Sequence, residues 1–169
     1  MKHHVLLSIL NLDLIEGNAH HAGKRAQEEL GSASPVPHSI LRAAQFHEFA
    51  EMLVRWVRTP EGAVVPPALL QPVAVIDVAK VLAEIAVDAP RGLVNLAGPK
   101  PEDLVDMARR TFAVLNEPIE LHPSWRGNIF GVEAAGEKLL AGPDARLAST
   151  TFEEWLKMRA SKEASKAAG

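Results

Sequence analysis

The chain has 169 residues, of which 47% are hydrophobic and 23% are charged, as expected for one globular domain with its own core. The net charge of -3 gives no electrostatic reason to expect nucleic acid or an anionic membrane surface as a partner. Cysteine is absent, which excludes disulfides, thiol catalysis and thiolate metal sites, and tyrosine is absent as well.

The first apolar run is too short for a secretory signal peptide and is interrupted by Asn11 and Asp13. No apolar run in the chain approaches the roughly 20 residues that a membrane-spanning helix needs. We therefore expect a cytoplasmic protein with no membrane contact.

The first third of the chain predicts a strand, a helix and a second strand. Residues 5–9, VLLSI, are a continuous apolar run, which is typical of a strand buried on both faces in a parallel sheet. Residues 19–30 predict a helix with Asn18 as its cap, residues 31–37 a turn rich in Gly, Ser and Pro, and residues 39–41 a short strand. This order indicates a right-handed parallel crossover.

The middle of the chain continues the alternation of helices and strands. Apolar residues at a helical period predict a helix over residues 46–56, and the following breaker-rich loop leaves room for a short strand at 63–65. Residues 70–75 predict an irregular strand, because Pro72 has no N–H to donate. A helix is then expected to begin at Asp77.

The last third predicts a strand at 93–96, a helix starting at Pro101 and further short elements. Thr151 and Glu154 have the spacing of a capping box for a final helix that ends near Met158. The remaining predicted elements are a strand at 119–121 and a short helix at 132–140. The alternation favours an α/β fold with a single domain over residues 1–158 and a flexible tail over 159–169.

Lys24 follows His20 by four residues, so in a helix both side chains lie on one face, one turn apart. The strand at 39–41 runs into Ala43, Ala44, Gln45 and Phe46, and ligands of open α/β sheets bind at that carboxyl end. The alternative for the charged residues around Lys24 is an ordinary solvated helix face.

Other kinds of site have little support in the sequence. His47 and Glu48 begin an H-E-x-x-H motif, but position 51 is Glu, so we expect no metal site. The glycines are scattered and form neither G-x-G-x-x-G nor a P-loop, so the sequence shows no pyrophosphate site. No G-x-S-x-G motif is present. Ser8 lies at the end of a strand, where it is either a functional group or a hydroxyl that is satisfied by the backbone.

Several blocks, in order, resemble the later half of NmrA-like proteins, atypical members of the extended short-chain dehydrogenase/reductase superfamily. The resemblance covers about residues 2–156, and its most specific blocks are AQEEL, ILRAAQFHEF and QPVAVIDVA. It implies the C-terminal part of a Rossmann-type NAD(P)-binding fold with a small substrate-binding region. The implied cofactor is NADP or NAD, and the implied partner is a small-molecule substrate that the sequence does not identify.

The resemblance also implies roles for individual residues. Lys24 falls on the active-site lysine of the family, which holds the nicotinamide ribose. Ser8 falls near the loop that lines the nicotinamide pocket. Ala43 and Ala44 fall on a loop that borders the cofactor, and Gln45 and Phe46 fall where that loop reaches the substrate.

Two features depart from the family pattern. His20 occupies the position of the catalytic tyrosine; imidazole can act as a general acid, but the neighbouring Lys24 favours its neutral form. Met1 falls where relatives have their fifth strand, so the glycine-rich loop has no counterpart. We therefore expect a truncated, catalytically impaired oxidoreductase; the alternative is a non-catalytic interaction or nucleotide-sensing module.

The strand from Val5 to Ile9 would be an inner strand in the complete family fold. With nothing beside it, this apolar edge is unpaired, which favours association. We expect self-association or a partner chain at this edge.

Overall fold

The computed structural model describes residues 2–15, 19–126 and 134–167. Its main sheet has four parallel strands, β1 (His4–Ile9), β2 (His38–Ala43), β6 (Gly92–Ala97) and β9 (Arg146–Leu147), in the order β1-β2-β6-β9. The predicted strand, helix and strand at the start of the chain are confirmed, and β1 and β2 are parallel as expected.

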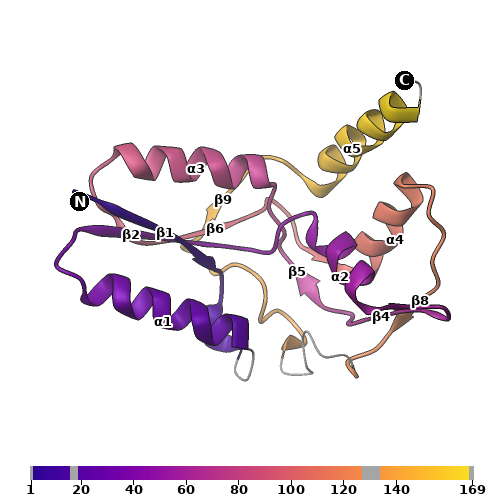
Figure 1. Ribbon diagram of the computed structural model, residues 1–169, viewed down its shortest axis with the longest axis horizontal. Coiled ribbons are helices and arrows are strands. Elements are labelled where there is room, and N and C mark those ends of the chain that lie inside the picture. Colours follow the sequence, from indigo (N-terminus) through magenta and orange to yellow (C-terminus); the bar gives the residue numbers. More distant parts are fainter. Residues whose placement is uncertain (1, 16–18, 127–133, 168–169) are drawn as a thin grey trace.

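Helix α1 (Ala19–Ala33) connects β1 to β2, and α3 (Val75–Val87) leads towards β6 (Figure 1). The two helices lie on opposite faces of the sheet. The apolar stripe of α3 is buried and joins residues of β2 and β6 in one hydrophobic cluster, with Val78, Val81, Ile85, Leu41 and Leu96 among its members. This layered arrangement explains why the inner strands read as continuous apolar runs.

A second hydrophobic cluster lies beside the main sheet. It is formed by α2, α4 and α5 together with short strands, and it buries Leu53, Leu104, Met107, Phe112 and Phe152. The remaining elements of the structure, which include those of this cluster, are η1 (Leu12–Leu14), α2 (Phe49–Val57), β3 (Arg58–Thr59), β4 (Gly62–Val65), β5 (Leu69–Leu70), β7 (Glu102–Asp103), α4 (Leu104–Val114), β8 (Leu121–Pro123) and α5 (Phe152–Ala167). Strands β3, β4 and β8 form one small sheet, and β5 and β7 form another.

The capping box of the last helix is confirmed. The backbone N–H of Glu154 donates to the Thr151 hydroxyl at 3.2 Å, and the backbone N–H of Thr151 donates to the Glu154 carboxylate at 2.8 Å. The two side chains thus satisfy donors that the helix itself leaves free. The helix continues to Ala167, so the predicted end near Met158 is wrong.

Other helix boundaries also differ from the sequence predictions. Helix α1 extends to Ala33, through the first part of the predicted turn. Helix α2 begins at Phe49 rather than 46, because Phe46 forms a bridge with Val73. Helix α4 begins at Leu104 rather than Pro101, because residues 102–103 pair with β5 and the Asp103 side chain accepts the N–H of Asp106.

The predicted strand at 70–75 is mostly replaced by other structure. Strand β5 covers only Leu69–Leu70, and α3 already begins at Val75, since the Ala74 carbonyl accepts the N–H groups of Asp77 and Val78. The predicted strand at 119–121 is displaced to Leu121–Pro123. Of the short helix predicted at 132–140, the first two residues lie outside the described part, and the rest form turns with one residue in a 3-10 conformation.

None of the helices in the described ranges is long and apolar enough to cross a membrane.

Candidate functional site

The carboxyl ends of β1 and β2 lie side by side, as the predicted site requires. Ile9 is the register partner of Ala43, and the N–H of Leu10 donates to the Ala43 carbonyl at 2.8 Å. Ala44 is buried and donates its N–H to the Leu96 carbonyl of β6 at 2.9 Å. Parallel pairing therefore brings the ends of three strands to one edge of the sheet, where α/β proteins bind their ligands.

Ser8 lies within this edge, opposite Arg42 in the register of β1 and β2. Its side chain is buried, with 4% exposure, and its hydroxyl has no hydrogen-bond partner. A buried hydroxyl is normally satisfied, because leaving it unpaired costs free energy. Ser8 therefore has an unpaired donor and acceptor that is enclosed by the protein near the end of β1.

Lys24 is carried by α1 to the same strand. Its ammonium donates to the Leu7 carbonyl at 2.9 Å and to the Gln27 side-chain oxygen at 3.1 Å. The structure thus places the predicted lysine against the residue next to Ser8, which the helical spacing alone did not show.

His20, the other predicted catalytic residue, is exposed near the start of α1. Its ring lies edge-on to the ring of His21, with 6.2 Å between the centroids. His21 is buried, and burial lowers the pKa of its imidazole, with smaller contributions from the charges of His20 and Arg25. His20 therefore lies at the protein surface, whereas its neighbour His21 is enclosed.

Gln45 and Phe46, the predicted substrate residues, form a loop that is fixed by Val73. The Val73 N–H donates to the Gln45 carbonyl at 2.9 Å, and the Val73 carbonyl accepts the N–H of His47 at 3.1 Å. Phe46 is partly buried against the cluster of the main sheet. The loop is therefore held directly beyond the end of β2, close to Ala43 and Ala44 in the chain.

An ion-pair network that the sequence did not reveal fixes α1 to the sheet. The Arg42 guanidinium donates to both carboxylate oxygens of Glu28, with distances of 2.6–3.2 Å, and to Asp13 at 2.8 Å. These carboxylates raise the pKa of Arg42, and its hydrogen bonds with Glu28 are the largest cause. Glu28 belongs to the charged run for which the sequence offered a solvated helix face as the alternative, but its side chain is buried.

Two side-chain amides, also missed from the sequence, fix a segment near the end of the sheet. Asn11 donates to the carbonyls of Lys138 and Leu140 at 2.9 and 2.7 Å. Gln71 accepts the N–H of Ala141 at 3.1 Å and donates to the carbonyl of Gly98 at 2.9 Å. The irregular composition of this segment gave no signal for these contacts.

A groove of about 600 Å³ is lined in part by Glu48, which follows Phe46 by two residues in the chain. Glu48 lines it; one of its carboxylate oxygens accepts the Trp155 indole N–H at 3.2 Å, while the other is buried without a hydrogen-bond partner. The other lining residues come from the start of α3 and from α5, and they are Ala74, Val75, Ile76, Met158, Arg159, Lys162 and Glu163. The volume suits a small-molecule ligand.

His47 is fully buried beside this groove, where its ring contacts Phe152 and Trp155. Its Nε2 lies 3.3 Å from the Thr150 carbonyl, and burial lowers the pKa of the imidazole. A neutral ring that donates from Nε2 fits these surroundings.

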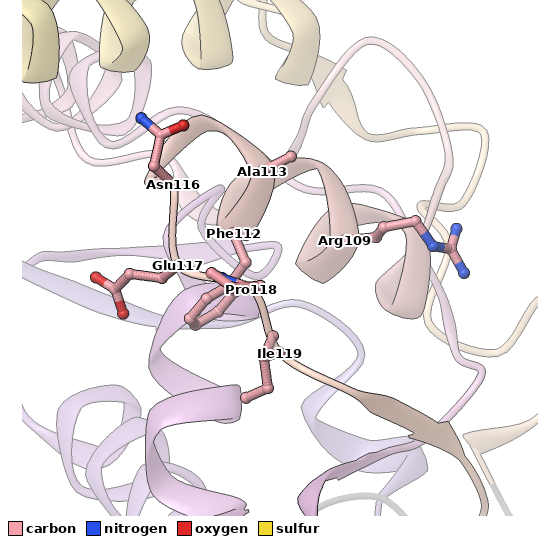
Figure 2. A pocket seen from close by; sticks show the side chains of 7 residues that line it. All are labelled: Arg109, Phe112, Ala113, Asn116, Glu117, Pro118 and Ile119. Atoms are coloured by element: carbon pink, nitrogen blue, oxygen red, sulfur yellow. The ribbon is translucent and has the colours of Figure 1, made fainter.

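A second cavity, of about 440 Å³, lies at the end of α4 and contains none of the predicted site residues. Figure 2 shows its lining, which includes Arg109 and Phe112 on the helix and Pro118 and Ile119 after it. Within the described residues, no group of three or more His, Asp or Glu side chains is placed to hold a metal ion.

No family model and no curated protein sequence matches the chain. Several solved structures do match its fold. An NADPH-dependent quinone oxidoreductase from Escherichia coli has a TM-score of 0.65 and 14% identity, covering 94% of this chain and 67% of that one. A UDP-galactose 4-epimerase has a TM-score of 0.60 and 18% identity, covering 99% of this chain and 64% of that one.

The Bordetella bronchiseptica enzyme WbmF, solved with NAD+ and UDP, has a TM-score of 0.58 and 17% identity, covering 99% of this chain and 60% of that one. These neighbours define the class: the chain has the Rossmann-like α/β fold of NAD(P)-dependent reductases and epimerases. The fold class predicted from the sequence is therefore confirmed. The chain spans only 60 to 67% of the length of these three neighbours.

Proposed function

We propose that the chain is an NmrA-like protein that binds the nicotinamide part of NADP or NAD at the carboxyl ends of β1 and β2. The observation that carries the proposal is the buried, unpartnered hydroxyl of Ser8, which lies in the strand that Lys24 contacts. A hydroxyl donor and an ammonium beside the same strand end suit the hydroxyls and amide of a nicotinamide riboside. The small side chains of Ala43 and Ala44 would let the nicotinamide come close to the backbone at the end of β2.

Binding is expected to be weak and catalysis impaired. No glycine-rich loop occurs in the sequence, so the helix N-terminus and backbone N–H groups that hold a pyrophosphate in dinucleotide folds are missing from these residues. No tyrosine is available to work with Lys24, and His20 is exposed. Nucleotide binding or sensing is therefore a better-supported role for these residues than hydride-transfer catalysis.

The groove beside Glu48 suits the small-molecule partner of such a protein. Glu48, which lines it, follows Phe46 by two residues in the chain.

The test compares two halves of the cofactor. Reduced nicotinamide mononucleotide should bind the chain with a Kd on the order of 1 mM, within about threefold of NADH, while AMP should not compete. The measurement is isothermal titration calorimetry. Equal binding of AMP and the nicotinamide mononucleotide, or no saturable binding of either, refutes the proposal.

The matched variants are Ser8→Ala and Ser39→Ala. Ser8→Ala removes a hydroxyl that has no partner, so it should leave stability unchanged and weaken nicotinamide mononucleotide binding about tenfold, or 1.4 kcal/mol. Ser39 is fully buried and its hydroxyl accepts the N–H of Arg91 at 2.9 Å, so Ser39→Ala should lower stability by about 1–2 kcal/mol without changing binding.

A further inference from the structure

Two histidines lie side by side at the amino ends of β1 and β2. His4 is the register partner of His38 in the parallel pairing of these strands. Register partners project their side chains from the same face of a sheet, and neighbouring strands are about 4.8 Å apart. The two imidazoles therefore leave the backbone at adjacent points, although the residues are far apart in the sequence.

Both side chains lie on the face of the sheet that α1 covers. Arg42 of β2 contacts Glu28 of α1, so its side chain points to that face. Alternate residues of a strand share a face, so His38 points the same way as Arg42, and its partner His4 does too. Because α1 runs from the carboxyl end of β1 back to the amino end of β2, its last turn lies at the same end of the sheet as the two histidines (Figure 1).

The end of α1 adds a field that favours a cation. The last turn of this helix contains no basic residue. The last carbonyls of a helix lack intrahelical donors and carry a partial negative charge. A positive ion is therefore better suited than an anion to this end of the α1-covered face.

The imidazoles of His4 and His38 are half-buried and have no partner. Within the described ranges, neither ring takes part in a hydrogen bond, an ion pair or a contact with another ring. His3, the preceding residue, differs, since its Nε2 lies 3.0 Å from the Ser39 hydroxyl oxygen. The ring nitrogens of His4 and His38 are thus available, and neutral imidazole is a common ligand of zinc.

We propose that His4 and His38 together bind a divalent cation of the Zn²⁺ class, with water in the remaining coordination positions. The two rings do not contact each other without the ion. Binding therefore requires rotation about a Cα–Cβ bond to another staggered position, which brings one nitrogen of each ring to about 2.0–2.1 Å from the metal.

This two-histidine site differs from a metal cluster with three or more protein ligands, of which the described residues contain none. With only two protein ligands, we expect a Kd on the order of 10 µM, which is much weaker than in structural zinc sites. The ion would join β1 to β2 at the end of the sheet opposite to Ser8 and Ala43. The site is therefore independent of the proposed nicotinamide site.

The experiment is a titration with Zn²⁺ at pH 7.5, followed by calorimetry and by imidazole NMR spectra of the full chain. Calorimetry should give one ion per chain, and the ring signals of His4 and His38 should shift together with saturation. The NMR measurement uses the unaltered chain, so it tests the site without relying on the folding of a variant. At about 100 times the Kd, Zn²⁺ should raise Tm by roughly 5–10 °C.

Two pairs of variants assign the ligands. His4→Gln and His38→Gln keep a polar side chain and remove one imidazole each, and each should weaken Zn²⁺ binding at least tenfold and abolish the Tm shift. The matched control is His3→Gln, because His3 adjoins His4 in the chain but projects from the opposite face of the strand. His122→Gln removes a histidine whose Nε2 lies 3.1 Å from the Glu61 carbonyl oxygen. Both controls should bind Zn²⁺ within twofold of the unaltered chain.

Four results would overturn the inference. Absence of saturable Zn²⁺ binding below 1 mM would exclude the site. Loss of affinity in only one of His4→Gln and His38→Gln would show that the two rings do not share an ion. An equal loss in His3→Gln, or shifts confined to the ring signals of other histidines, would place the ion elsewhere. One ion per two chains would show that a second molecule, rather than water, completes the coordination.

Discussion

Replacing Glu28 by Gln tests whether the ion pair with Arg42 holds α1, and with it Lys24, against the sheet. Glutamine keeps the shape of the side chain and removes its charge. The side chains of Arg42 and Glu28 are only 15% and 11% exposed, so the guanidinium would lose its main partner in a site that water reaches poorly.

The expected loss follows from this burial. Removing one partner of a buried ion pair costs about 3–5 kcal/mol, because the remaining charge is left uncompensated. Arg42 keeps Asp13 at 2.8 Å, whose side chain is 62% exposed, and this second partner reduces the penalty. We expect Glu28→Gln to lower the free energy of unfolding by about 2–3 kcal/mol, or Tm by roughly 5–10 °C.

The assay is urea unfolding followed by circular dichroism at pH 7, with Glu153→Gln as the control. Glu153 and Lys157 form an ion pair in which both side chains are at least 70% exposed, so its loss should cost at most about 0.5 kcal/mol. A double variant with Arg42→Met should recover part of the loss, since no buried charge remains. Equal small effects of Glu28→Gln and Glu153→Gln would refute the reasoning.

Two further predictions concern stability. A Cβ added at Gly98 would lie 1.7 Å from the Pro72 carbonyl oxygen, so Gly98→Ala should lower the free energy of unfolding by about 3 kcal/mol or more. Gly31 lies on α1 with open space around it, so Gly31→Ala should raise the free energy of unfolding by about 0.5–1 kcal/mol. Thermal unfolding that shifts in the same direction for both variants would contradict this. Burial lowers the pKa of His47 below its ordinary 6.5, so unfolding takes up a proton below pH 6.5 and stability should fall by up to about 1.4 kcal/mol per pH unit of acidification. Urea unfolding between pH 7.5 and 5.5 should show a smaller slope for His47→Gln; an unchanged slope would assign the acid sensitivity to other groups.

The sequence predicted the parts of the fold that depend on local patterns. The apolar run of β1, the stripe of α3 and the capping box of Thr151 and Glu154 each have a period or a spacing that one segment contains in full. The boundaries that moved depend on partners far away in the chain. Phe46 leaves a helical pattern because Val73 pairs with it, and residues 102–103 leave one because β5 pairs with them.

The candidate site was predictable to the same extent. The sequence order of β1, α1 and β2 was enough to bring Ser8 and Ala43 to one edge of the sheet. It was not enough to show that Glu28, a residue of α1, is buried. A carboxylate on a helix face is usually solvated, and its partner Arg42 follows 14 residues later in the chain. Gln71 and Asn11 were missed for the same reason, since their hydrogen bonds reach 70 and 129 residues along the chain.

Lys24 shows how a contact between elements decides what a side chain does. Helical spacing alone places this lysine on a surface that either faces solvent or faces a ligand. The structure adds a third possibility, because the Leu7 carbonyl needs a donor and the ammonium supplies it at 2.9 Å. The ammonium has three N–H donors and uses two of them, for the Leu7 carbonyl and the Gln27 side chain, so one donor is left. The contact with β1 therefore fixes the position of Lys24 without using up its hydrogen-bonding capacity.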